Sequence, residues 1–95
     1  MEYIKVLWKH NLVDEPCCLY SELDGDRWET RKVETYADGT NGYASHDETC
    51  GGTKLSIEPL PTLDEIAEDP QFAPSVIEQA EFDRLWQQRT QKQRR

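Results

Sequence analysis

An alternation of apolar and polar side chains with a period of two constrains this fold most strongly. Over residues 3–10 it places Ile4, Val6 and Trp8 on one face, and a second run over residues 17–23 repeats the pattern. Side chains on a β-strand point alternately to opposite faces. The sequence therefore opens with two predicted strands, the first of them half-buried.

Turn residues divide the next part of the chain. Asp24-Gly25-Asp26 predicts a tight turn, because Asp-Gly readily supplies a positive φ. Residues 27–36 follow as a hairpin partner, but their apolar side chains do not keep one phase. One extra residue near Arg31 or Lys32 would restore the phase, so we predict a β-bulge there.

Residues 38–42, Asp-Gly-Thr-Asn-Gly, form the strongest turn cluster. A short fourth strand is predicted over residues 43–46, and a loop over residues 47–52. Residues 54–57 then form a brief strand or an extended segment that crosses the sheet. These patterns give four or five strands in the first two-thirds of the chain.

The helical signals come last. Thr62-Leu-Asp-Glu65 is a capping box, and Pro70 ends the helix that it begins. Residues 72–77 read as extended. A final helix from about Gln79 into the low nineties would dock Phe82, Leu85 and Trp86, which are spaced i, i+3, i+4, and project its polar end into solvent.

Strands followed by helices are typical of an α+β domain. We predict an antiparallel sheet of four to five strands with two short helices packed on one face, both in the C-terminal third. Residues 1–86 would form this single domain, and residues 87–95 would be a basic, Gln/Arg-rich C-terminal extension of the last helix.

A length of 95 residues leaves room for one domain. The chain has no apolar run near the roughly 20 residues of a membrane helix, and no start that resembles a signal peptide. Cys17, Cys18 and Cys50 make an odd count, which does not suit a disulfide framework. A disulfide to Cys50 would require its strand to meet that of Cys17 or Cys18. Free thiols and a cytoplasmic location are expected.

The charge is uneven. The formal net charge is -8, yet residues 1–83 hold all 19 acids and only six bases. Such a surface repels phosphate backbones and attracts a basic protein. Residues 84–95 carry five bases and no acid, which is typical of a solvated terminus. We therefore predict a basic protein partner and no direct nucleic-acid or membrane binding.

Signs of catalytic, cofactor or metal chemistry are weak. The chain has no glycine-rich nucleotide motif and no His-Glu-x-x-His, and its two histidines lack a ligand spacing. His46 and Cys50 are four residues apart on a predicted loop, which does not fix their geometry. We predict no catalytic residues, no cofactor, no metal and no enzyme activity.

Several short segments together form a recognisable pattern. They are Tyr3-Ile-Lys-Val-Leu-Trp-Lys-His10, Leu19-Tyr-Ser-Glu-Leu-Asp24, Arg27-Trp-Glu29, Arg31-Lys-Val-Glu34, Gly42-Tyr-Ala-Ser45, Gly51-Gly-Thr53, and Glu81-Phe82 with Trp86. In these segments the chain resembles a family of small uncharacterised bacterial proteins. The resemblance implies a bacterial single-domain protein and supplies no site residues. The Cys-Cys pair, Cys50 and the Gln/Arg tail depart from the family pattern, which argues against a shared thiol mechanism.

Two main hypotheses of function follow. The first is a small acidic inhibitor of the immunity or antitoxin type, which masks a basic partner such as a nuclease toxin. Its predicted partner-binding residues are Glu22, Asp24, Asp26, Glu29 and Glu34, with Trp28 and Tyr36 as aromatic anchors. The alternative is a ligand-binding module or small enzyme with a pocket near Cys50-Gly51-Gly52. A module that assembles through an exposed edge strand is a third option, and the sequence does not decide the oligomeric state.

Overall fold

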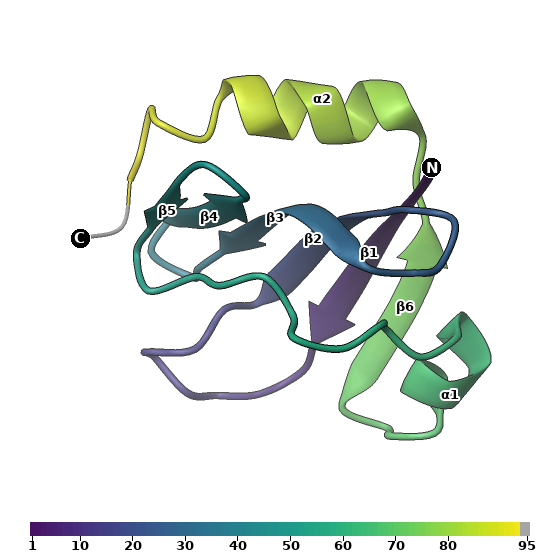
Figure 1. Ribbon diagram of the computed structural model, residues 1–95. Coiled ribbons are helices and arrows are strands. Elements are labelled where there is room, and N and C mark those ends of the chain that lie inside the picture. The colour runs from purple at the N-terminus through teal and green to yellow at the C-terminus, as the bar shows by residue number, and fades with distance from the viewer. Residues whose placement is uncertain (94–95) are drawn as a thin grey trace.

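The computed structural model describes residues 1–93, which form one six-stranded antiparallel sheet and two helices (Figure 1). The strand order is β5-β4-β3-β2-β1-β6. The elements are β1 (Glu2–Trp8), β2 (Cys18–Leu23), β3 (Glu29–Thr35), β4 (Asn41–Ser45), β5 (Thr49–Cys50), α1 (Leu63–Ala67), β6 (Phe72–Val76) and α2 (Gln79–Gln87). The α+β class and the antiparallel sheet are confirmed.

The sheet has six strands, so the prediction of four to five was too low. Residues 49–50 were expected in a loop and form β5, while residues 54–57 form no strand. The extended segment before α2 is β6, which pairs with β1 at the edge of the sheet. Pro74 obscured this strand, because proline is unusual inside a sheet.

Pro74 is tolerated because of its register. The bonds from Lys9 N to Gln71 O and from Ile77 N to Tyr3 O mark hydrogen-bonded pairs of the β1–β6 ladder. Since such pairs alternate with non-bonded ones, Pro74 opposite Val6 would direct an N–H away from β1. The position without an N–H donor therefore faces the free edge of the sheet, and this disfavours pairing of β6 with a further strand.

The predicted bulge lies in β3. Glu22 pairs with Arg31, and Leu23 pairs with Glu29, so Thr30 is the extra residue. The bulge is thus one residue before Arg31, close to the position that the sequence predicts. It changes the phase of the strand, so that Glu29 and Val33 face opposite sides of the sheet although their spacing is even.

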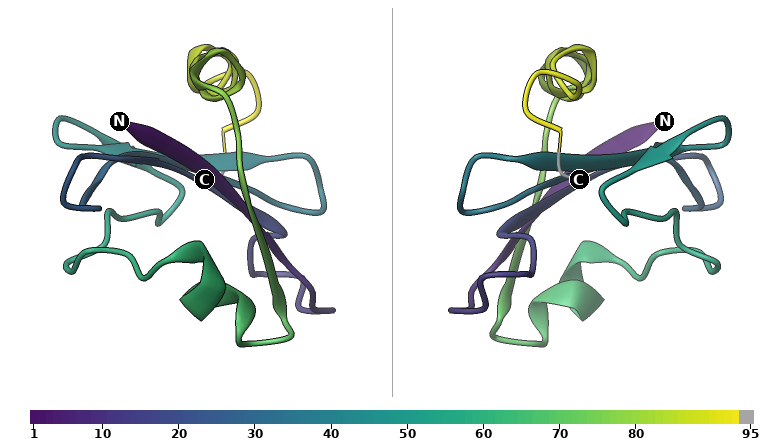
Figure 2. Two further views of the ribbon diagram at one scale, coloured as in Figure 1. Left: turned by 90° about the vertical axis from the view of Figure 1, so that its right-hand side faces the viewer. Right: turned by 90° about the vertical axis from the view of Figure 1, so that its left-hand side faces the viewer.

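The helices cover opposite faces of the sheet, which corrects the prediction that both pack on one face (Figure 2). Under α2, Phe82 packs with the side chains of Tyr3, Tyr20, Val33 and Tyr43. Under α1, Leu63 and Ile66 pack with Ile4, Val6 and Leu23. Strand β1 is buried on both faces because Tyr3 and Ile4, of opposite parity, are both core residues.

The capping box at the start of α1 is confirmed. Glu65 N donates to Thr62 Oγ1 at 3.2 Å, and Thr62 N donates to Glu65 Oε1 at 3.1 Å. The bond from Thr62 N to the carboxylate, and a second one from Thr62 Oγ1 at 3.0 Å, lower the pKa of Glu65. Two of the free N–H groups at this helix end are thereby satisfied.

The chain after α2 returns to the sheet, although we expected the helix to continue into solvent. The helix ends at Gln87, and the Arg89 guanidinium lies 4.1 Å from the Trp86 ring centroid. Asn41 N then donates to Lys92 O at 2.7 Å, and Gln93 forms a parallel bridge to Asn41. Stacking and backbone pairing thus hold this basic segment down; its residues 94 and 95 lie outside the described part.

The three cysteines are half-buried and form no disulfide within residues 1–93. Cys18 is on β2 and Cys50 on β5, with β3 and β4 between them. Three strand spacings amount to about 14 Å, whereas a disulfide needs Cα atoms within about 7 Å. The strands do not meet, so no bridge joins them. Neither helix in residues 1–93 is long and apolar enough to cross a membrane.

Candidate functional site

The structure does not gather the seven predicted partner-binding residues on one surface. Glu22 is 7% exposed and lies on the α2 face of the sheet. Its carboxylate accepts hydrogen bonds from Arg31 Nε at 2.9 Å, Arg31 Nη2 at 2.6 Å, Thr30 Oγ1 at 2.6 Å and Tyr3 Oη at 2.9 Å. The bonds from Arg31 lower the pKa of Glu22 to about 2, against the effect of burial. The Glu22 carboxylate is therefore engaged in contacts within the protein.

Glu29 and Glu34 lie on the opposite, α1 face. Glu29 is 4% exposed and accepts from Ser21 Oγ at 2.7 Å and from Ser56 N at 2.6 Å. Glu34 accepts from Thr53 Oγ1 at 2.6 Å. Both carboxylates are thus engaged inside the protein, where they hold the loop of residues 51–62 against the sheet.

The two predicted aromatic anchors lie at opposite ends of β3. Trp28 directly precedes the strand and Tyr36 directly follows it. Eight residue steps along a strand span about 26 Å. Trp28 is 42% exposed, whereas Tyr36 is half-buried beside the turn that begins β4. Trp28 is therefore the predicted anchor with a substantial exposed area.

A tight turn presents Trp28. Asp24 Oδ1 accepts from the backbone N–H groups of Asp26, at 2.9 Å, and of Trp28, at 3.0 Å. The positive φ of this turn is at Arg27, 67°, and not at the glycine. Arg27 Nη2 donates to Pro61 O at 2.8 Å and Nε to Leu60 O at 3.0 Å, so the strained residue also fixes the loop before α1.

A hollow of about 510 Å³ lies beside Trp28. Its walls come from the β2–β3 turn, from His46 after β4, and from Leu55, Ser56 and Ile57. Ile57 is 90% exposed. Two long apolar side chains thus flank one concave surface at the end of the sheet where β3 begins.

Two further hollows adjoin this one. The first shares Thr30 and His46 with it and continues to Trp86 and Arg89. The second shares Asp24 and extends to Met1. The end of the sheet is therefore one broad, shallow surface, which suits a macromolecule better than a small ligand.

The predicted pocket at Cys50-Gly51-Gly52 has a different setting. Cys50 packs against the core beneath α2, close enough to raise the pKa of Tyr43, although burial is the larger cause. Gly51 and Gly52 form a turn with φ values of 73° and 78°. His46 is exposed, and residues 1–93 contain no group of three His, Cys, Asp or Glu that could hold a metal ion.

A family model described as a domain of unknown function (DUF6881) matches residues 2–91. The chain belongs to the DUF6881 family. This confirms the resemblance to a family without an assigned role, and the match covers every helix and strand described above. No curated protein matches the chain, and neither does any solved structure.

On this DUF6881 domain, Asp24 and Asp47 line the hollows at this end of the sheet, and Asp26 and Glu58 are next in sequence to residues that line them. Asp24, Asp26, Asp47 and Glu58 have no ion pair among the described residues. We call the set Asp24, Asp26, Trp28, His46, Asp47, Ile57 and Glu58 the Trp28 surface. The sequence pattern identified Asp24, Asp26 and Trp28; the other four were missed because loop residues carry no periodic signal.

Proposed function

We propose that this protein binds a basic protein through the Trp28 surface and thereby masks it, as an inhibitor of the immunity or antitoxin type. The carrying observation is that Trp28 and Ile57 are exposed beside a hollow that Asp24 lines. Asp47 lines the adjoining hollow, Asp26 and Glu58 are next in sequence to lining residues, and none of the four carboxylates has an ion pair among the described residues. In this proposal the protein acts by binding alone, without catalysis.

The physical roles in such a complex divide between the two kinds of side chain. Large aromatic residues buried at an interface centre carry much of the binding energy. Carboxylates around them attract a cationic partner over distances near the Debye length and raise the association rate. The hydrogen bonds of Asp24 to the turn keep Trp28 in place before binding, so little ordering entropy is lost on association.

The test begins with affinity capture from the native host using the full chain, followed by kinetics with the captured protein. We expect a basic protein whose dissociation constant rises about 30-fold or more for Trp28→Ala. Val13→Ala is the matched control, since Val13 is also exposed but lies in the β1–β2 loop at the other end of the sheet. Equal weakening by both variants would contradict the proposal.

Charge is tested separately. The variant Asp26→Asn/Asp47→Asn/Glu58→Gln should slow association and reduce its dependence on ionic strength between about 0.01 and 0.15 M. A control with the same change in net charge replaces three exposed carboxylates elsewhere: Glu15, Glu68 and Glu78. If the control slows association as much as the first variant, the carboxylates of the Trp28 surface have no special role.

A further inference from the structure

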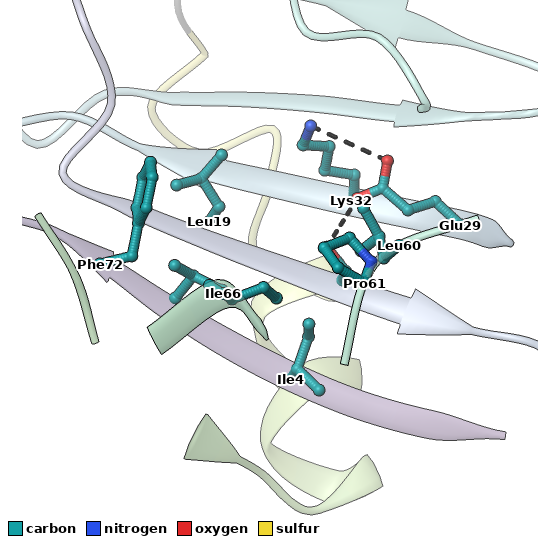
Figure 3. A pocket seen from close by; sticks show the side chains of 10 residues that line it. Ile4, Leu19, Glu29, Lys32, Leu60, Pro61, Ile66 and Phe72 are labelled. Atoms are coloured by element: carbon teal, nitrogen blue, oxygen red, sulfur yellow. Dashed lines mark hydrogen bonds and ion pairs between the residues drawn. The ribbon is translucent and has the colours of Figure 1, made fainter. Parts of the chain in front are cut away.

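A separate cavity, of about 220 Å³, lies between the sheet and α1 (Figure 3). Its wall is apolar over most of its extent, with Ile4, Leu19, Ile66 and Phe72 facing the space. Glu29 and Lys32 lie at one side, and Phe72 lies at the other (Figure 3). The cavity therefore has an apolar body and one charged end.

At the charged end of the cavity, the Lys32 ammonium group has N–H donors without an acceptor in the described part of the protein. Lys32 Nζ lies 3.8 Å from Glu29 Oε1 and 3.8 Å from Glu34 Oε2, and its side chain is largely buried. These separations are too long for hydrogen bonds, and within residues 1–93 no atom accepts one from Nζ. An ammonium group carries three N–H donors. No buried side-chain nitrogen or oxygen in residues 1–93 lacks a hydrogen-bond partner, so solvent reaches Nζ and its N–H donors are open to a ligand.

The bound molecule is constrained by charge and by volume. Two carboxylates and one ammonium leave this end with one net negative charge, which disfavours an anion. A protein cavity of about 150 Å³ lined by aliphatic residues holds benzene. A volume of 220 Å³ accommodates one ring with a short substituent.

We propose that this cavity binds a small neutral molecule with an apolar, ring-sized body and one hydrogen-bond acceptor. The body lies against Ile4, Leu19 and Ile66, and the acceptor takes an N–H of Lys32. This site is separate from the Trp28 surface and does not depend on the function proposed for it, although Glu29 borders both hollows.

Three probes of similar size test the proposal by NMR titration of the 15N-labelled full chain. Acetophenone offers a carbonyl acceptor, isopropylbenzene has the same shape without it, and benzoate is an anion. We expect acetophenone to shift the amide signals of residues that line the cavity. Isopropylbenzene should bind about tenfold more weakly and benzoate not at all. Equal affinity for the first two probes, or no shifts with acetophenone up to its solubility, would overturn the proposal.

Two variants locate the binding. Leu19→Phe fills the cavity without changing its charges and should abolish binding of both neutral probes. Lys32→Met should remove the preference for acetophenone, whereas Lys9→Met, at an exposed lysine, should keep it. If Lys32→Met does not fold, Leu19→Phe alone tests the location of the site. Unchanged binding of the neutral probes to Leu19→Phe would show that they bind outside this cavity.

Discussion

The substitution Glu22→Gln tests how the protein accommodates a buried carboxylate. The change keeps the size of the side chain and removes its charge, while Arg31 stays in place. Glu22 accepts four hydrogen bonds, two of them from the Arg31 guanidinium, whose own pKa is raised by the same contact. The variant leaves that guanidinium with Asp83 as its remaining charged partner.

The magnitude follows from the pKa of Glu22, which is lowered from 4.5 to about 2 in the folded protein. A shift of about 2.5 units corresponds to about 3 kcal/mol of unfolding free energy. Because the folded pKa is below the unfolded one, this contribution is complete above about pH 4.5. It is lost as the pH falls toward about 2, and less than half remains at pH 3.

Urea unfolding followed by far-ultraviolet circular dichroism measures the effect. At pH 7 we expect Glu22→Gln to unfold with about 3 kcal/mol less free energy than the wild type, and the difference should narrow as the pH is lowered to 3. Glu15→Gln, at an exposed carboxylate, is the control and should change little at either pH. A destabilisation by Glu22→Gln that is the same at pH 3 and pH 7 would refute the reasoning.

Three further substitutions test other parts of the fold by urea unfolding. Gly42→Ala would place a Cβ 2.2 Å from Thr53 Oγ1, so we expect a loss of about 1–3 kcal/mol, and an unchanged midpoint would disprove this tight approach. Thr62→Ala removes the capping box and should cost about 1 kcal/mol, whereas Thr62→Ser should cost little. Arg27→Gly relieves the positive φ but breaks the contacts to the loop before α1. It should therefore unfold with more free energy than Arg27→Ala, and the opposite order would contradict backbone strain at this position.

Most of the strand pattern could be read from local signals. The periods of β1 and β2, the turn after Leu23 and the bulge in β3 each depend on a few adjacent residues, and the structure has them close to their predicted positions. The capping box of α1 is equally local. Strand β6 was missed because its proline argues against a strand, and only its register beside β1 makes that proline acceptable.

The candidate site was less predictable. The sequence identified Trp28 as the exposed tryptophan, but alternation does not tell whether a carboxylate meets water or an internal partner. Glu22 depends on Arg31 and Tyr3, and Glu29 depends on Ser21 and Ser56, so residues from separate strands and loops decide their burial.

By itself, the sequence determined the first four strands and the turns between them, where the helices begin, and that the chain carries a strong negative charge, because these properties depend on neighbours along the chain. Only the tertiary structure decided that the two helices take opposite faces, that three of the predicted surface acids serve internal contacts, and that Trp28 and Ile57 meet at one concave surface. The reason is that burial and pairing are set by residues distant in sequence, which local periodicity does not encode.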